Sequence, residues 1–177
     1  QGFATSDTHQ VGHDSVEVKA GDFTGNGIPD LIVINRGTDD ASLFLGNGDG
    51  TFTPAGHLEV AESPRDVAPA DLDNNGTIDL AIGSLAQHEA VVFLNSGEGD
   101  PGWEMFEDPI GYDGGGTGPH SISTADVQLN GRQDILMANV HSGGSISVMI
   151  NDGNGAFNEV YLYGNGTSSP ASIIGVD

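Results

Sequence analysis

The chain has 177 residues, 36% of them hydrophobic, so it is long enough to bury the core of one ordinary domain. Only four basic residues oppose 26 acidic ones, and the net charge of -22 excludes nucleic acid as a partner, because binding it requires a basic surface. The absence of cysteine excludes disulfides and thiolate zinc sites, and no apolar run is long enough for direct insertion into a membrane.

Glycine is abundant, with 28 residues, and it recurs in Asn-Gly and Asp-Gly pairs between short apolar runs. Such pairs are typical of tight hairpin turns, because Asn, Asp and Gly tolerate the positive φ angles that these turns need. The spacing of the pairs therefore predicts an all-β chain.

The first predicted unit is built around a polar loop at 22–30 (DFTGNGIPD). Val18 lies four positions before this loop, and an apolar run follows it at 31–34. A second apolar run, 43–45, leads to a glycine-rich turn that ends at Phe52. Short apolar runs bounded by turn residues are typical of strands, so the unit supplies about four strands.

The same loop recurs at 71–79 (DLDNNGTID) and 126–134 (DVQLNGRQD), and the starts of the three loops are 49 and 55 residues apart. A fourth copy begins at Asp177, 51 residues after Asp126. A small four-stranded sheet cannot cover both of its faces, so repeated units must stack on one another. The sequence therefore predicts an all-β β-propeller of four-stranded blades, with about three blades present.

The register of the repeats indicates that residues 1–177 are a single propeller segment cut within repeats at both ends. Phe3 lies 49 residues before Phe52, at the end of a repeat, and the chain stops at the first residue of the fourth loop. Closed propellers have about four to eight blades. We therefore expect the rest of the ring to come from the same chain or from other copies.

The three polar loops have the spacing of calcium ligands. Calcium prefers six to eight oxygen ligands, which a tight loop can supply from alternate positions. The ligands expected in the second loop are the side chains of Asp71, Asp73, Asn75 and Asp79 and the carbonyl of Thr77. Those expected in the first loop are the side chains of Asp22, Thr24, Asn26 and Asp30 and the carbonyl of Ile28. Those expected in the third loop are the side chains of Asp126, Gln128, Asn130 and Asp134 and the carbonyl of Arg132.

The second loop offers the most carboxylates, so we expect it to bind calcium best, and the third loop, with a long Gln and a nearby Arg, to bind worst. Ion-free turns rich in Asp and Asn are the alternative, because these residues favour turns in any case. An EF-hand or dockerin is excluded, since such loops need an acidic ligand at position 12, where these copies have Val33, Ile82 and Met137.

The order of an apolar strand, a D-x-[DTQ]-x-N-G-x-x-D loop, a second apolar strand and a G-[DN]-G-x-F turn resembles the FG-GAP or VCBS repeat. The resemblance covers nearly the whole chain and implies a seven-bladed, integrin-alpha-like propeller in a secreted or cell-surface protein. It also implies that each calcium loop joins the first two strands of a blade, on one face of the propeller, in a structural role.

The resemblance further implies that ligands bind the opposite face, on the loops between the second and third strands and between blades. These loops are expected at 35–41, 84–90, 139–144, 58–65, 111–120 and 164–171. The candidate ligand-binding residues on them are Asn35, Arg36, His88, His120, Asn139 and His141.

The expected function is a calcium-binding extracellular module for cell adhesion, or for recognition of a glycan or protein ligand, with no catalytic residues assigned. The alternative is the propeller of a polysaccharide lyase or another secreted carbohydrate-active enzyme, in which His120 and His141 could act as proton acceptor and orienter. Trp103 could stack on a sugar ring or simply pack between neighbouring sheets.

Overall fold

The computed structural model describes residues 8–97, 102–141, 143–164 and 170–175. These residues form three four-stranded antiparallel sheets, in which the strands pair in chain order, and one short helical turn, η1 (Trp103–Met105). In the described ranges no helix is long and apolar enough to cross a membrane. The prediction of an all-β chain with about three four-stranded blades is confirmed.

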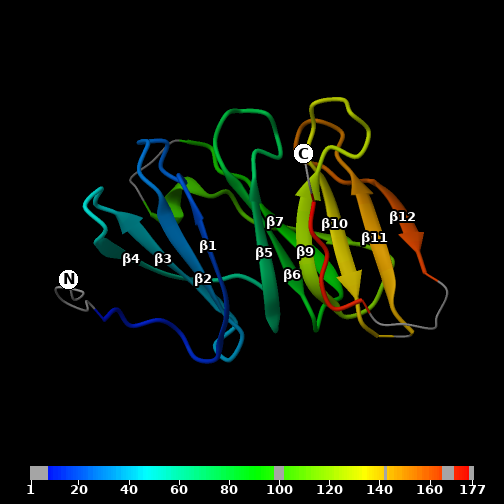
Figure 1. Ribbon diagram of the computed structural model, residues 1–177, viewed down its shortest axis with the longest axis horizontal. Coiled ribbons are helices and arrows are strands. Elements are labelled where there is room, and N and C mark those ends of the chain that lie inside the picture. Colours follow the sequence, from blue (N-terminus) through cyan, green and yellow to red (C-terminus); the bar gives the residue numbers. More distant parts are fainter. Residues whose placement is uncertain (1–7, 98–101, 142, 165–169, 176–177) are drawn as a thin grey trace, which may run out of the picture.

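The three sheets are called blades 1, 2 and 3. Blade 1 consists of β1 (Ser15–Gly21), β2 (Asp30–Asn35), β3 (Asp40–Gly46) and β4 (Phe52–Glu59). Blade 2 consists of β5 (Pro64–Ala70), β6 (Asp79–Ser84), β7 (Glu89–Phe93) and β8 (Ile110–Asp113). Blade 3 consists of β9 (Pro119–Ala125), β10 (Asp134–Asn139), β11 (Ser145–Ile150) and β12 (Glu159–Tyr163). The blades lie side by side, and their first strands, β1, β5 and β9, are neighbours (Figure 1).

Blade 2 is buried on both faces because its side chains alternate between two cores. Leu80 and Ile82 of β6 pack into the core shared with blade 1. Ala81, between them, packs into the core shared with blade 3. Alternation of this kind follows from the two-residue period of a strand, and it shows why these sheets stack instead of standing alone.

The outer strand of blade 3 is not covered by another part of the described chain. All five residues of β12 are exposed, including Leu162 and Tyr163, which are 52% and 58% exposed. Exposed apolar residues on an edge strand favour packing against a further strand or another chain. The seven-bladed ring stays a prediction, and Phe3 and Asp177, which fix the expected ends of the repeats, lie outside the described residues.

The three polar loops lie at one end of the blades, at the top of Figure 1, each directly between the first and second strands of its blade. We call them loop 1 (22–30), loop 2 (71–79) and loop 3 (126–134). Their placement between the first two strands agrees with the prediction for all three blades.

A buried asparagine ties each later loop to the loop before it. In blade 2 the side-chain amide of Asn95 donates to the carbonyl of Phe23 in loop 1, at 2.8 Å, and to that of Ile78, at 3.2 Å. In blade 3 the amide of Asn151 donates to the carbonyl of Leu72 in loop 2, at 2.7 Å. The loops are thus joined to one another through specific hydrogen bonds as well as through the apolar cores.

Candidate functional site

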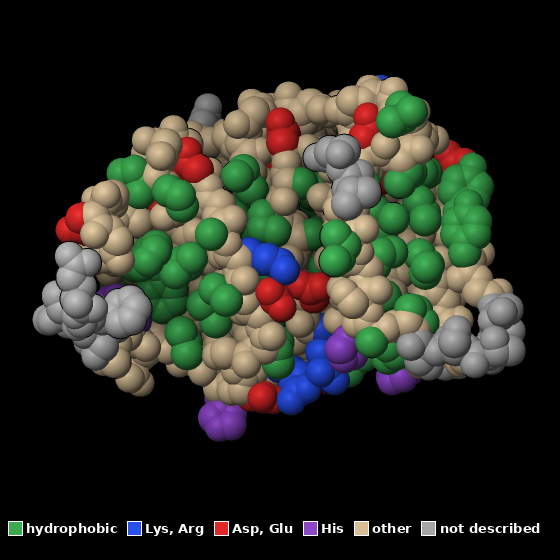
Figure 2. Space-filling view, viewed as in Figure 1, with side chains coloured by type: hydrophobic (Ala, Val, Ile, Leu, Met, Phe, Trp, Pro, Cys, Tyr) green, Lys and Arg blue, Asp and Glu red, His purple; other side chains and the backbone are tan. Residues whose placement is uncertain are grey.

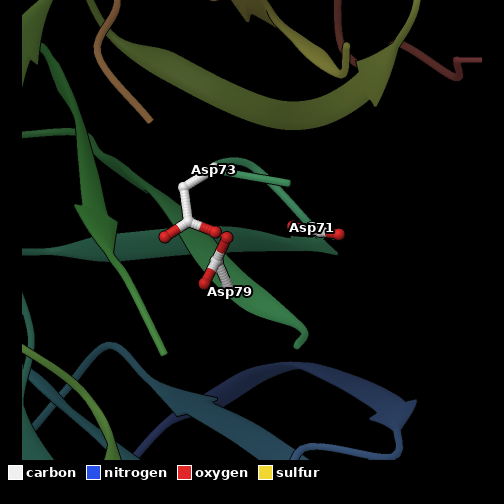
Figure 3. Close-up of side chains that lie close together, drawn as sticks. All are labelled: Asp71, Asp73 and Asp79. Carbon is white, nitrogen blue, oxygen red and sulfur yellow. The ribbon is translucent and has the colours of Figure 1, made fainter. Parts of the chain in front are cut away.

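Loop 2 brings three carboxylates together. Asp71 follows the end of β5, Asp79 begins β6, and Asp73 lies on the loop between them. Each of the three offers an oxygen within 4.8 Å of the others, and they are the only such group of three acidic or metal-ligating residues in the described chain. Figure 3 shows the carboxylates of Asp73 and Asp79 facing each other, with Asp71 beside them.

The backbone of loop 2 is shaped by its own side chains. The two oxygens of Asp71 accept hydrogen bonds from the N–H groups of Asn75, at 3.1 Å, and Gly76, at 3.0 Å. Asn74 and Gly76 have positive φ angles of 61° and 89°, which Asn and Gly adopt at low cost. These turns fold the loop back on itself and keep its acidic side chains on one side.

Asp79 is fully buried beneath the loop. Its carboxylate accepts hydrogen bonds from the N–H groups of Leu72, at 2.6 Å, and Asn95, at 2.7 Å. Burial raises the pKa of Asp79 to about 6; the two N–H groups lower it in part, and the charges of Asp73 and Asp71 raise it. The two N–H groups therefore offset only part of the cost of placing the negative charge of Asp79 in this cluster.

The donor set of loop 2 fits a hard divalent cation such as calcium. No described salt bridge involves any of the three carboxylates, so no basic side chain neutralises them. Carboxylate oxygens this close together repel one another unless protons or a cation intervene. The side-chain oxygen of Asn75 faces the N–H of Thr77, at 2.7 Å, and the hydroxyl of the same residue.

Loop 1 has the same turns with fewer charges. Asp22 accepts from the N–H groups of Asn26 and Gly27, and the N–H of Ile28 donates to the Asn26 side chain. The buried Asp30 accepts from the N–H of Thr24, whose hydroxyl lies 3.4 Å from the same oxygen. Loop 1 therefore has two carboxylates where loop 2 has three.

Loop 3 also repeats the turns, with a neutral Gln128 at the position that Asp73 has in loop 2. Asp126 accepts from the N–H groups of Asn130 and Gly131, and these backbone bonds lower its pKa. The Gln128 side chain accepts from the Asn130 amide, and the Arg132 guanidinium donates to the carbonyl of Asp152. The buried Asp134, at the end of the loop, accepts from the N–H groups of Val127 and Asn151. The occupancy of each loop by calcium stays a prediction.

The raised pKa of Asp79 predicts an unusual pH dependence for the calcium-free protein. Its folded pKa, about 6, exceeds the unfolded value of about 3.9, so its contribution to stability is fully present below pH 4 and is lost as the pH rises through 6. In chelator the free energy of unfolding should therefore be larger at pH 5 than at pH 7, by on the order of 1 kcal/mol.

Urea unfolding at the two pH values measures this difference. High salt is the control, because it screens repulsion among exposed acidic groups but not the cost of burying the Asp79 charge. In calcium the dependence should reverse, because protons compete with the cation for the carboxylates. A calcium-free protein that loses stability from pH 7 to pH 5 would contradict the assignment.

Two of the ligand residues predicted on the opposite face are buried inside their blades. Asn35, the last residue of β2, donates to Asp40 and Ser42, and Asn139, the last residue of β10, donates to Ser145 and Ser147. Both asparagines are 0% exposed, and their side chains bond to the next strand of the same hairpin instead of lining the surface. Contact of these two residues with a ligand stays a prediction.

The other predicted ligand residues are accessible. The Arg36 guanidinium pairs with Asp14. The rings of His88 and His141 meet edge to face at 6.1 Å across blades 2 and 3. The ring of His120 instead contacts the carbonyl of Ala171, 3.2 Å from Nδ1. The structure thus brings His88 and His141 together, a pair that the sequence pattern did not predict.

Trp103 packs on the core between blades 1 and 2, against Phe106, at a ring separation of 5.6 Å. Its indole N–H is buried with no acceptor among the described residues. Of the two sequence interpretations, packing between sheets is the one that these contacts support.

Comparison with known proteins agrees with the architecture. A family profile described as an FG-GAP-like repeat matches residues 22–82. Among solved structures, the chain resembles a lectin from Agrocybe aegerita described as specifically recognising non-reducing terminal N-acetylglucosamine, with a TM-score of 0.53 and 22% identity. The match covers 88% of this chain and 39% of the lectin chain. No curated protein sequence matches the chain. Residues 22–82 are therefore similar to an FG-GAP-like repeat, within three blades of β-propeller fold.

Proposed function

We propose that this chain is part of a β-propeller that recognises glycans in a secreted or cell-surface protein, with calcium as a structural ion in loop 2. The observation that carries the recognition function is the propeller fold shared with a lectin whose described ligand is a sugar. Since that likeness concerns the fold, the ligand of this chain has to be tested directly.

The blade ends opposite the calcium loops provide surface for recognition. Arg36 and His88 are half-buried there, and His120 and His141 are exposed. Loops at the ends of a rigid sheet can vary without disturbing the cores, so ligand sites occur on them preferentially. These side chains are held on such a scaffold, because their strands belong to the packed blades.

Calcium fits a structural role because loop 2 is joined to both neighbouring loops. Asn95 links the start of β6 to loop 1, and Asn151 links loop 2 to blade 3. A cation held by Asp71, Asp73 and Asp79 would offset the repulsion within the cluster and fix the loop that these bonds connect. The ion would then stabilise the packing of the blades without touching the ligand.

The lyase alternative has no specific observation in its favour. In the described chain the ring contact of His141 is with His88 of the neighbouring blade, and His120 is bonded to a carbonyl. The alternative pairs His120 with His141 as proton acceptor and orienter, and the contacts of these two rings are with other partners.

A glycan array probed with the labelled chain, in calcium and in chelator, tests the proposal. We expect binding to a defined subset of glycans, weaker in chelator because loop 2 loses its ion. A folded chain that binds no glycan in either buffer would overturn the recognition function. Binding that is equal in the two buffers would retain recognition and overturn the role of calcium.

A further inference from the structure

The first strand of each blade carries a one-residue bulge near its start. The pairing register skips one residue in β1 and β5, at Val16 and Arg65, and the pairing of β9 with β10 skips His120. The three bulged positions are 49 and 55 residues apart, the spacing of the repeat itself. A bulge turns its side chain away from the regular alternation of the strand and often re-aims it into a site.

The three bulged residues line one cavity, of about 750 Å³, between the first strands of the blades. Ala171, which lies 51 residues after His120, lines it too. Figure 2 shows this region: acidic and basic side chains meet in a central hollow, and Lys or Arg and His side chains gather below it, at the end opposite the calcium loops. The repeat thus places equivalent positions around a common opening.

Arg65 brings an uncompensated positive charge to this cavity. No described salt bridge involves it, and its Nε is buried with no hydrogen-bond acceptor. Burial lowers the pKa of Arg65, and so does the nearby Arg36, whereas Asp14 raises it. Asp14 is already engaged, since it accepts from the Arg36 Nε at 2.9 Å. A buried donor without an acceptor is costly unless a ligand supplies one.

His120 lines the same cavity as Arg65, from β9, the first strand of the next blade. Asp66, which follows Arg65, accepts from the hydroxyl of Ser121 at 2.9 Å, and Ser121 follows His120. A carbonyl can only accept, so the 3.2 Å contact with Ala171 places a hydrogen on Nδ1 of His120 and leaves Nε2 for another partner. Arg65 and His120 therefore present donor and ring nitrogen atoms at the same opening.

The other cation of the cavity is not free for a ligand. The Lys19 ammonium lies 3.0 Å from Glu17 and 3.8 Å from Asp66, so two carboxylates already neutralise it. With a net charge of -22, the rest of the chain repels polyanions. A single anionic group on an otherwise neutral ligand suits the unpaired Arg65 guanidinium best, because a planar carboxylate can accept two parallel hydrogen bonds from it.

We propose that Arg65 binds the carboxylate of an acidic sugar residue at the mouth of the cavity between β1, β5 and β9, and that His120 binds a hydroxyl of the same sugar. The inference rests on the proposed glycan-recognition function and names the class of sugar and the residues that would select it. Arg65 would pair with the carboxylate through its guanidinium, and His120, which carries its hydrogen on Nδ1, would accept a hydrogen bond from the hydroxyl at Nε2.

The test is a titration of the isotope-labelled full chain with methyl β-D-glucuronide, with methyl β-D-glucoside as the neutral counterpart. The glucuronide should shift the Arg65 side-chain N–H signal, and Arg65→Gln should weaken its binding about tenfold or more. Asp108→Asn is the control, because Asp108 is exposed and lies outside both the cavity and the three polar loops. This control should leave the affinity unchanged.

Glucuronide binding that is equally strong in Arg65→Gln, or no shift of the Arg65 signal at saturation, would overturn the acidic-sugar site. Neutral glycans could still bind on the array, so the recognition function would survive that result. If Arg65→Gln does not fold, Arg65→Lys is the deciding variant, because it keeps the charge but cannot donate two parallel hydrogen bonds to a carboxylate. Weaker glucuronide binding by Arg65→Lys supports the site, and unchanged binding overturns it. Glucuronide binding without any hit on the array would instead retain this site and narrow recognition to acidic monosaccharides.

Discussion

Replacing Asp73 by asparagine should abolish most of the stabilisation that we expect calcium to give to this chain. The variant keeps an oxygen that can accept from the Asn75 N–H, which lies 3.0 Å from Asp73 in the structure, and removes one of three clustered charges. At about 100 times its dissociation constant, a ligand stabilises the folded state by about 2.7 kcal/mol. We expect less than about 1 kcal/mol to remain in Asp73→Asn at the same calcium concentration.

In chelator we expect the stability difference between Asp73→Asn and the wild type to have the opposite sign. The charge of Asp73 raises the pKa of the buried Asp79, so the wild-type cluster is strained when no cation is present. Asp73→Asn should therefore be at least as stable as the wild type in chelator and less stable in calcium. Thermal unfolding in the two buffers measures both differences.

Asp108→Asn is the matched control for net charge, because Asp108 is an exposed carboxylate outside the three loops. This control should respond to calcium as the wild type does. Asp22→Asn, in loop 1, should have a smaller effect than Asp73→Asn, because loop 1 has no cluster of three carboxylates among the described residues. Equal calcium responses in Asp73→Asn and Asp108→Asn would contradict the placement of the ion in loop 2.

Replacing Asn95 by alanine should destabilise the fold by on the order of 3 kcal/mol. Asn95 is 0% exposed, and its amide donates to the carbonyls of Phe23 and Ile78 while its oxygen accepts from the N–H of Gly97. The substitution leaves the carbonyl of Phe23 without this partner in a buried site, and it removes the part-buried bonds to Ile78 and Gly97. It also removes the hydrogen bond that joins loop 2 to loop 1.

Asn47→Ala is the control, because Asn47 is exposed and bonds within its own turn, to Thr51 and Thr53. Its loss should cost less than about 1 kcal/mol. Urea unfolding of the two variants compares them directly. If Asn95→Ala costs no more than Asn47→Ala, the apolar cores alone hold the blades together, and the proposed role of the asparagine link is wrong.

Much of the fold could be predicted because its determinants are local. The strands β2, β6 and β10 follow directly from short apolar runs after the loops, and the loops from Asp, Asn and Gly at fixed offsets. The repeat then fixed how many blades to expect, because each unit has the same pattern. Loop 2 could be ranked first from its charges alone, and it is the loop in which three carboxylates converge.

The contacts between blades could not be predicted in this way. Asn95 and Asn151 have the appearance of ordinary turn residues, and nothing local shows that their amides reach the preceding blade. The signal available was comparative: Gly46 occupies the corresponding position in blade 1, where its N–H bonds to Asp30 as that of Asn95 bonds to Asp79.

The opposite face was only partly predictable for a related reason. Asn35 and Asn139 were assigned to the ligand face because the FG-GAP resemblance places loops there between the second and third strands, but cross-hairpin hydrogen bonds bury them. Arg65 was not singled out, because a bulge is a property of strand pairing and not of composition. Its repeat spacing to Val16 and His120 was the signal that could have shown it.

Calorimetric titration of the chelator-stripped chain with calcium tests most directly whether loop 2 is an ion site. We predict saturable binding with a dissociation constant of about 10⁻⁴ to 10⁻³ M or tighter, the range of extracellular calcium modules, and loss of that binding in Asp73→Asn. The absence of any binding heat, together with unchanged thermal stability in calcium, would contradict the assignment of Asp71, Asp73 and Asp79 as a calcium site.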